Sequence, residues 1–173
     1  MAAYAVEVSR RQRQFCPDDF TTSRIAKVAE WMKKENNPGL LLYGTVGTGK
    51  STMLRSISDI LKDVLGLEVA RTTAYRLVED FQDRDSKFRY SDCRRARCLI
   101  IDDLGVEPDT CMVWGTEYAP VRELLYDRYD RQAVTIISTN LGEEELLLKY
   151  GARIADRLRG TYDRITFKAA SYR

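Results

Sequence analysis

The chain has 173 residues, of which 44% are hydrophobic, and its formal net charge at pH 7 is +2. This length and apolar content suit one compact domain, and the low net charge excludes a polyelectrolyte that binds nucleic acid over its whole surface. The absence of histidine excludes histidine acid–base chemistry, and none of the four cysteines forms a C-x-x-C pair, which argues against a zinc site. No segment resembles a signal peptide or a membrane span, so we expect a cytoplasmic protein.

The pattern of helices and strands predicts an α/β fold. Residues 1–21 are expected to form a polar, basic N-terminal arm, and residues 22–173 the folded core. The predicted helices are 22–35, 51–65, 74–81 and 121–129, and the predicted strands are 40–43, 67–72, 98–101, 134–138 and 165–167. Strands that alternate with helices favour a parallel sheet between two layers of helices, so we predict a three-layer fold.

The sequence GTVGTGKS at residues 44–51 follows the first predicted strand and opens the second predicted helix. This is the spacing and the context of a Walker A phosphate-binding loop. Its glycines let the backbone curl so that N–H groups face phosphate oxygens, and the helix N-terminus adds partial positive charge. Lys50 would neutralise the β- and γ-phosphates of ATP, and the Ser51 hydroxyl would bind Mg2+. The residues predicted to bind the nucleotide are Gly44, Thr45, Val46, Gly47, Thr48, Gly49, Lys50, Ser51 and Thr52.

The sequence CLIIDDLG at residues 98–105 has the pattern of a Walker B motif, four apolar residues followed by two acids. A parallel strand delivers the side chains at its carboxyl end to the edge of the sheet where the phosphate loop lies. We therefore predict that Asp102 binds Mg2+ and that Asp103 polarises the attacking water. The second acid favours an ATPase with a conformational cycle over a switch GTPase, although such ATPases more often use the longer glutamate.

Two later segments place polar side chains where they bear on the same chemistry. Asn140 ends the predicted strand that neighbours the Walker B strand, where its amide can hydrogen-bond the attacking water or the γ-phosphate. Arg153 and Arg157 lie four residues apart on one face of a predicted helical segment. The plain alternatives are that Asn140 forms a turn and that both arginines belong to a solvated helix surface.

These motifs, in this order and at these intervals, resemble the DnaC/IstB-type AAA+ ATPases of the initiator-related branch. The resemblance spans about residues 40–173 and includes the G-x-R-x-x-D-R-L sequence at residues 151–158. It implies an AAA+ core of the P-loop NTPase type, and because the sequence stops at Arg173 we expect the helical lid to be absent or minimal. It further implies that Asn140 is sensor 1 and that Arg157 is the arginine finger for a neighbouring subunit's ATP. With Asp103, these two would form the catalytic set.

A basic segment at residues 84–97 is a candidate nucleic-acid surface. Cations neutralise phosphates, and aromatic rings stack on unpaired bases. In the family that the chain resembles, contacts with DNA come from this general region. The candidate residues are Arg84, Lys87, Phe88, Arg89, Tyr90, Arg94, Arg95 and Arg97. The alternative is a solvated helix whose two rings are tucked into the core.

The resemblance implies an ATPase that binds ATP and Mg2+ and assembles into a homo-oligomeric ring or spiral on DNA, most simply single-stranded DNA. Its partner would be a replicative helicase or a transposase, because the family contains both helicase loaders and IstB-like transposition helpers. Two other classes stay open. One is a small-molecule P-loop kinase, which would consume ATP only with an acceptor. The other is an ATP-gated adaptor that binds nucleotide and hydrolyses little of it.

Overall fold

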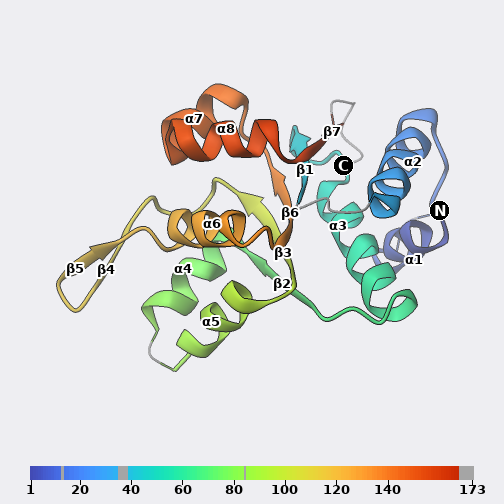
Figure 1. Ribbon diagram of the computed structural model, residues 1–173. Helices are drawn as coiled ribbons and strands as arrows, with labels where there is room; N and C mark the ends of the chain where they lie inside the picture. Colours follow the sequence, from blue (N-terminus) through green and yellow to red (C-terminus); the bar gives the residue numbers. More distant parts are fainter. Residues whose placement is uncertain (13, 35–38, 84, 168–173) are drawn as a thin grey trace.

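A computed structural model describes residues 1–12, 14–34, 39–83 and 85–167 and shows a parallel five-stranded sheet between two layers of helices (Figure 1). The strand order across the sheet is β2-β3-β6-β1-β7. The strands are β1 (Gly39–Gly44), β2 (Val69–Thr73), β3 (Cys98–Leu104), β6 (Val134–Thr139) and β7 (Asp163–Phe167). The predicted α/β three-layer fold is therefore confirmed, and every predicted strand overlaps a strand of this sheet.

Helices cover both faces of the sheet. One layer contains α1 (Ala2–Arg10), α2 (Asp19–Lys33) and α3 (Lys50–Asp59), which continues into the π-helical turn η1 (Ile60–Val64). The other layer contains α4 (Ala74–Gln82), α5 (Lys87–Arg95), α6 (Pro120–Asp130), α7 (Glu143–Tyr150) and α8 (Ala152–Gly160). Two separate apolar clusters fill the spaces between the sheet and these layers.

The central strands are buried over most of their length because both faces of the sheet are covered, and β1 is the most apolar of them. In β1, Leu40 and Leu42 belong to the cluster under α1, α2 and α3, whereas Leu41 belongs to the cluster under the other layer. All three are at most 3% exposed. Side chains of a strand alternate between its faces, so an unbroken apolar run fills both cores at once.

The register between strands sets the position of the site. Parallel pairing places Tyr43 of β1 beside Thr139 of β6, so the two strands end at the same edge of the sheet. Strand β3 also pairs with β6, but the register shifts between Ile101 and Leu104. The two acids, Asp102 and Asp103, lie inside this irregularity. The carboxyl ends of β1, β3 and β6 therefore meet where a parallel sheet of this kind binds ligands.

The structure contains elements that the sequence-based prediction lacked. Helix α1 lies within the segment that was expected to be a polar arm, and it packs on α3 with Tyr4 buried. Helices α5 and α7 were not among the predicted helices. The prediction also lacked an antiparallel hairpin that leaves the body of the molecule, formed by β4 (Cys111–Val113) and β5 (Thr116–Tyr118) (Figure 1).

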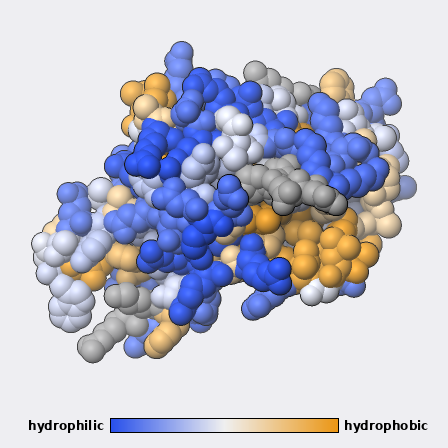
Figure 2. Space-filling model, viewed as in Figure 1, coloured by the Kyte–Doolittle hydropathy of each residue, from blue (hydrophilic) through white to orange (hydrophobic). Residues whose placement is uncertain are grey.

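Most of the face shown in Figure 2 is hydrophilic, with an apolar patch on the side where α3 and η1 lie. The exposed apolar residues of this segment include Val64, Leu65 and Leu67. Among the described residues, no helix has both the length and the apolar character that are needed to cross a membrane.

Candidate nucleotide-binding site

The loop between β1 and α3 has the backbone of a phosphate cradle. Gly44, Gly47 and Gly49 have φ angles of 146°, 82° and 93°, which side-chain-bearing residues rarely adopt. A Cβ atom on Gly44 would lie 2.3 Å from the carbonyl oxygen of Phe167, so this position also needs a glycine for space. Helix α3 starts at Lys50, and the N–H groups of its first turn face the loop as a ready anion site.

Lys50 lies inside the loop and is buried. Its ammonium donates hydrogen bonds to the carbonyl oxygens of Gly44 and Thr45, at 2.8 and 2.7 Å, and to Asn140 Oδ1 at 2.7 Å. Burial lowers the pKa of Lys50, while the carboxylates of Asp103 and Asp102 oppose that shift. Phosphate oxygens are acceptors of the same kind, so the ammonium is placed where it could exchange these partners for phosphate.

Ser51 and Asp102, which the two motifs predict as oxygen ligands of Mg2+, lie next to each other. The Ser51 hydroxyl donates a hydrogen bond to Asp102 Oδ1 at 3.1 Å. Mg2+ in nucleotide sites is held by one or two protein oxygens together with phosphate oxygens and water. In the part of the chain that the structure describes, no group of three or more His, Cys, Asp or Glu residues could hold a metal. The residues present fit Mg2+ bound together with a nucleotide.

Asp103 and Asn140 both line the cavity that contains the loop. Burial and the neighbouring Asp102 carboxylate raise the pKa of Asp103, and Lys50 lowers it. The backbone of Asp103 has a φ angle of 55°, in the left-handed region that non-glycine residues seldom occupy. The structure therefore brings together four side chains, Lys50 from the start of α3, Asp102 and Asp103 from β3, and Asn140 from the end of β6.

The cavity has a volume of about 800 Å3, which is within the usual range for small-molecule sites. One wall is formed by the N-terminal segment, which motif reasoning missed because no motif marks it. Its lining residues include Tyr4, Phe15 and Cys16. The Tyr4 and Phe15 rings meet edge to face with their centres 5.4 Å apart. This wall stands beside the loop, so a nucleotide in the cradle would contact residues that were expected to belong to an arm.

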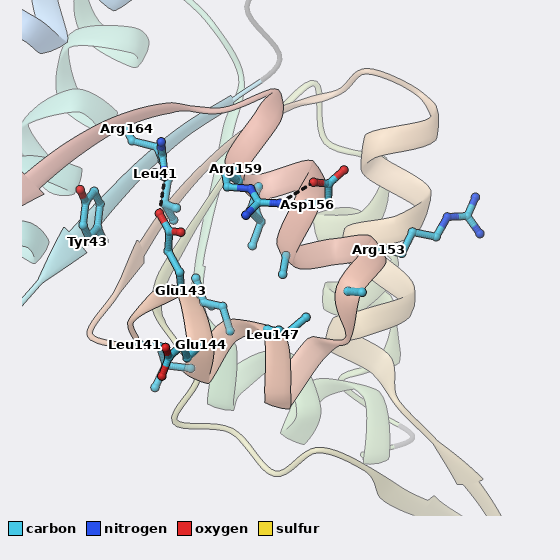
Figure 3. A pocket seen from close by; sticks show the side chains of 14 residues that line it. Leu41, Tyr43, Leu141, Glu143, Glu144, Leu147, Arg153, Asp156, Arg159 and Arg164 are labelled. Atoms are coloured by element: carbon cyan, nitrogen blue, oxygen red, sulfur yellow. Dashed lines mark hydrogen bonds and ion pairs between the residues drawn. The ribbon is translucent and has the colours of Figure 1, made fainter.

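A second cavity of about 650 Å3 lies between α7, α8 and the sheet (Figure 3). Ion pairs at its wall join Glu143 to Arg164 at 2.6 Å and Asp156 to Arg159 at 2.8 Å. It contains no residue of the phosphate loop and neither acid of the Walker B motif. The residues of both motifs that line a cavity therefore line the first one.

Arg157 is not part of this constellation within one chain. Its guanidinium pairs with Asp130 at 2.9 Å and lies 3.9 Å from the centre of the Tyr129 ring. Asp130 ends α6 and precedes β6, so Arg157 is held near the amino ends of the strands. The nucleotide cavity lies at their carboxyl ends. Arg153, one turn earlier, is exposed and stacks on Tyr126.

The predicted nucleic-acid contact by Tyr90 is wrong. Tyr90 is 5% exposed, its hydroxyl donates to the Pro120 carbonyl oxygen at 2.8 Å, and its ring packs against Phe81. One face of α5 is covered by α4 and α6, and Tyr90 lies on that face. Phe88, in contrast, is 76% exposed.

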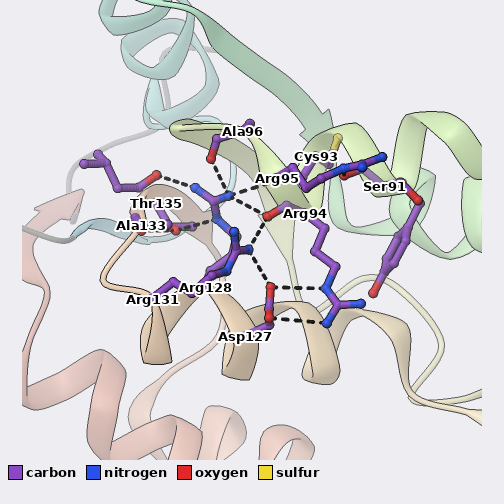
Figure 4. A network of polar contacts seen from close by, with 12 residues as sticks. Ser91, Cys93, Arg94, Arg95, Ala96, Asp127, Arg128, Arg131, Ala133 and Thr135 are labelled. Carbon is purple, nitrogen blue, oxygen red and sulfur yellow. Dashed lines mark hydrogen bonds and ion pairs between the residues drawn. The ribbon is translucent and has the colours of Figure 1, made fainter.

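The basic residues of the same segment fall into different classes. Arg94 binds both oxygens of Asp127, at 3.1 and 3.3 Å, and these hydrogen bonds lower the pKa of that carboxyl group (Figure 4). Arg84 lies outside the described residues, and Lys87 is the first residue of α5. The remaining arginines and Phe88 are exposed, and we call them the α5 surface: Phe88, Arg89, Arg95 and Arg97.

A family model of the bacterial DnaA ATPase domain matches residues 17–108, just over half of the chain. The chain belongs to the bacterial DnaA ATPase-domain family. This membership confirms the predicted resemblance to the initiator-related AAA+ ATPases. The matched residues include both the phosphate loop and the Walker B strand of the family's domain. A search of curated proteins finds no match.

Solved structures share the fold at low identity. The DnaC helicase loader has 17% identity and a TM-score of 0.71, over 89% of this chain and 93% of that one. DnaI has 21% identity and a TM-score of 0.69, over 92% and 87%. Replication initiator DnaA bound to AMPPCP and single-stranded DNA has 15% identity and a TM-score of 0.65, over 90% of this chain and 48% of that one. These matches show that this chain has the fold of AAA+ domains.

Proposed function

We propose that this protein is an ATPase of DNA replication that binds ATP with Mg2+ and self-associates on single-stranded DNA in the cytoplasm. Its action on a partner such as a replicative helicase is part of the same proposal. The observation that carries it is the convergence of Lys50, Asp103 and Asn140 on one cavity behind a glycine loop, with Asp102 hydrogen-bonded to Ser51 of the same cavity wall. Family membership and the fold shared with helicase loaders support it.

Each residue of the site has a separate task in this proposal. The loop N–H groups and Lys50 bind the phosphates, and Ser51 and Asp102 hold Mg2+. Mg2+ neutralises charge on the phosphates when it is bound. Asp103 accepts a hydrogen bond from the attacking water, and Asn140 orients that water or the γ-phosphate. Arg157 of a second copy supplies the remaining positive charge.

The α5 surface is the proposed DNA contact. Three exposed arginines offer positive charge to the backbone, and the exposed Phe88 ring offers a face on which a base can stack. The matched DnaA structure, which holds both an ATP analogue and single-stranded DNA, supports the pairing of these two ligands.

Calorimetry with a non-hydrolysable ATP analogue and Mg2+ tests nucleotide binding. Lys50→Ala should weaken binding at least tenfold, because a charged hydrogen bond contributes about 1.5–3 kcal/mol. Lys62→Ala, an exposed lysine of η1, is the matched control and should bind as the wild type does. Circular dichroism establishes that both variants fold. Equal affinity in Lys50→Ala and wild type would refute the assignment of the loop.

Cys16 reports where the nucleotide sits. It is exposed at the wall of the proposed cavity, whereas Cys93, Cys98 and Cys111 are buried. Burial raises the pKa of Cys93 and Cys98 to about 11, so these thiols stay protonated at pH 7.5. The analogue at ten times its Kd should slow maleimide labelling of Cys16 about tenfold. Labelling at the same rate with saturating analogue would place the nucleotide elsewhere.

A further inference from the structure

The hydroxyl of Ser138 lies between the two acids of the Walker B motif. Ser138 Oγ donates a hydrogen bond to Asp102 Oδ1 at 2.5 Å and accepts one from the Asp103 backbone N–H at 2.9 Å. Ser138 is fully buried, and no nucleotide contact has been assigned to it above. A single side chain from β6 thus touches both acids of β3.

A hydroxyl group suits this position because it can donate one hydrogen bond and accept others at the same time. An ionised carboxylate only accepts and a backbone N–H only donates, so a residue that bridges them must do both. Alanine can do neither. Without the hydroxyl, the Asp103 N–H would lose this partner, and of the two hydroxyl bonds to Asp102 that the described residues make, the longer one from Ser51 would stay.

The bridge coincides with the irregular part of the sheet. Pairing between β3 and β6 is regular up to Ile101 and resumes at Leu104, and Asp103 between them has a φ angle of 55°. Strained backbone of this kind persists only where its surroundings hold it. The next residue of β6, Thr139, donates to the Leu104 carbonyl oxygen at 2.6 Å and so fixes the far side of the same irregularity.

We propose that Ser138 is a positioning residue that holds the two acids in their relative places and aims the Asp103 carboxylate into the nucleotide cavity. This role rests on the ATPase function proposed above. Ser138 acts through Asp102 and Asp103 and does not itself touch the substrate. Its loss should therefore lower the rate of hydrolysis more than the affinity for ATP.

Steady-state kinetics of Ser138→Ala test whether kcat changes more than KM. We expect kcat to fall about 10- to 100-fold, because small misplacements of a catalytic group have effects of this size, while KM stays within about threefold. Ser56→Ala is the matched control. Ser56 is also a buried serine, but its hydroxyl lies 2.9 Å from the carbonyl oxygen of Thr52 in α3 and 3.4 Å from that of Ala3 in α1. Its kcat should equal that of the wild type.

Amide hydrogen exchange at Asp103, measured by NMR without nucleotide, gives a readout that does not depend on activity. Exchange should be about tenfold faster in Ser138→Ala and unchanged in Ser56→Ala. Ser138→Thr keeps the hydroxyl and completes the series. Across wild type, Ser138→Ala and Ser138→Thr, kcat should follow the protection of the Asp103 amide.

The role of Ser138 would be refuted by an unchanged kcat in Ser138→Ala. It would also be refuted by a variant whose kcat changes while the protection of its Asp103 amide does not, or the reverse. Absence of ATP turnover in the wild type would instead refute the proposed function. The exchange series would then still decide whether Ser138 holds the Asp103 backbone.

Discussion

Arg128 is a charged residue with no exposed surface. Its guanidinium donates to three carbonyl oxygens at the end of α5, those of Cys93, Arg94 and Ala96, at 2.8–3.3 Å. Two further hydrogen bonds reach Val134 and Thr135 at the start of β6 (Figure 4). Burial lowers the pKa of Arg128 to about 10, so the group stays charged at neutral pH. Helix carbonyls carry partial negative charge and compensate the buried cation.

We expect Arg128→Met to lower the free energy of unfolding by about 3 kcal/mol or more, because several buried carbonyls would lose a charged donor. Arg131→Ala, in the same network but 43% exposed at its side chain, should cost no more than about 1 kcal/mol. Urea unfolding at pH 7 measures both. An Arg128→Met variant as stable as Arg131→Ala would mean that the network contributes little to the fold.

At the residue scale, the sequence patterns predicted which side chains belong to the candidate site, but they did not predict which side chains are buried or exposed. The glycines and Lys50 lie where the Walker A motif predicted, because the loop's spacing depends on local backbone geometry, and Asp102 follows the apolar run of β3 as the Walker B pattern predicted. Tyr90 and Arg128 could not be placed in this way. Which face of α5 is buried depends on how α4 and α6 pack against it, and that packing is set by residues distant in sequence.

At the scale of elements, we predict that the charged and the aromatic residues of the α5 surface contribute to DNA binding in ways that can be measured separately. Replacing Arg89, Arg95 and Arg97 with alanine should flatten the log–log salt dependence of single-stranded DNA binding by about two units, since each lost phosphate contact contributes about 0.7. Phe88→Ala should weaken binding by about 1–3 kcal/mol without changing the slope, because stacking releases no counterions. Fluorescence anisotropy with an ATP analogue present measures both.

The control for this experiment is a triple variant with the same change in charge. Lys27, Lys33 and Arg55 are exposed on α2 and α3, in the other helix layer. Their replacement with alanine should leave the salt slope near that of the wild type. If both triple variants flatten the slope equally, DNA binding depends on the net charge of the protein and not on the α5 surface.

Element prediction succeeded where burial was complete and failed where it depended on tertiary contacts. Strands β1, β3 and β6 were predicted, because each contains a buried apolar run: Leu40 to Leu42, Cys98 to Ile101, and Ile136 with Ile137. The β4–β5 hairpin consists of two three-residue strands whose base is held by contacts with α7, such as the Tyr150–Glu107 hydrogen bond. No local pattern predicts such a hairpin. Helix α1 was missed although most of its residues are apolar, because no capping side chain marks its start; it buries Tyr4 on the nucleotide side.

At the scale of the whole molecule, assembly should control activity. If Arg157 acts on a neighbour's nucleotide, specific ATPase activity should rise with protein concentration. Arg157→Ala should then bind ATP normally and hydrolyse it about 10³-fold more slowly. An equimolar mixture with Lys50→Ala should recover part of the activity, because each variant supplies the group that the other lacks.

Arg157 also packs against Tyr129 and Asp130, so its replacement needs a check of stability by thermal unfolding. Arg153→Ala, an exposed arginine one turn earlier on α8, is the matched control and should leave hydrolysis unchanged. Activity that is independent of concentration, together with inactive mixtures, would exclude a shared site.

The common direction of the five strands gives the molecule two unlike ends. Strand β6 has six residues and spans about 20 Å, with Asn140 just beyond one end and the Arg157–Asp130 pair near the other. Arg157 therefore cannot reach the nucleotide cavity of its own chain. In the proposed assembly copies join head to tail, as in any heterologous contact. An open row then completes one site fewer than it has copies, and only a closed ring completes them all. The turnover per copy, compared between assemblies of known size, would distinguish an open row from a closed ring.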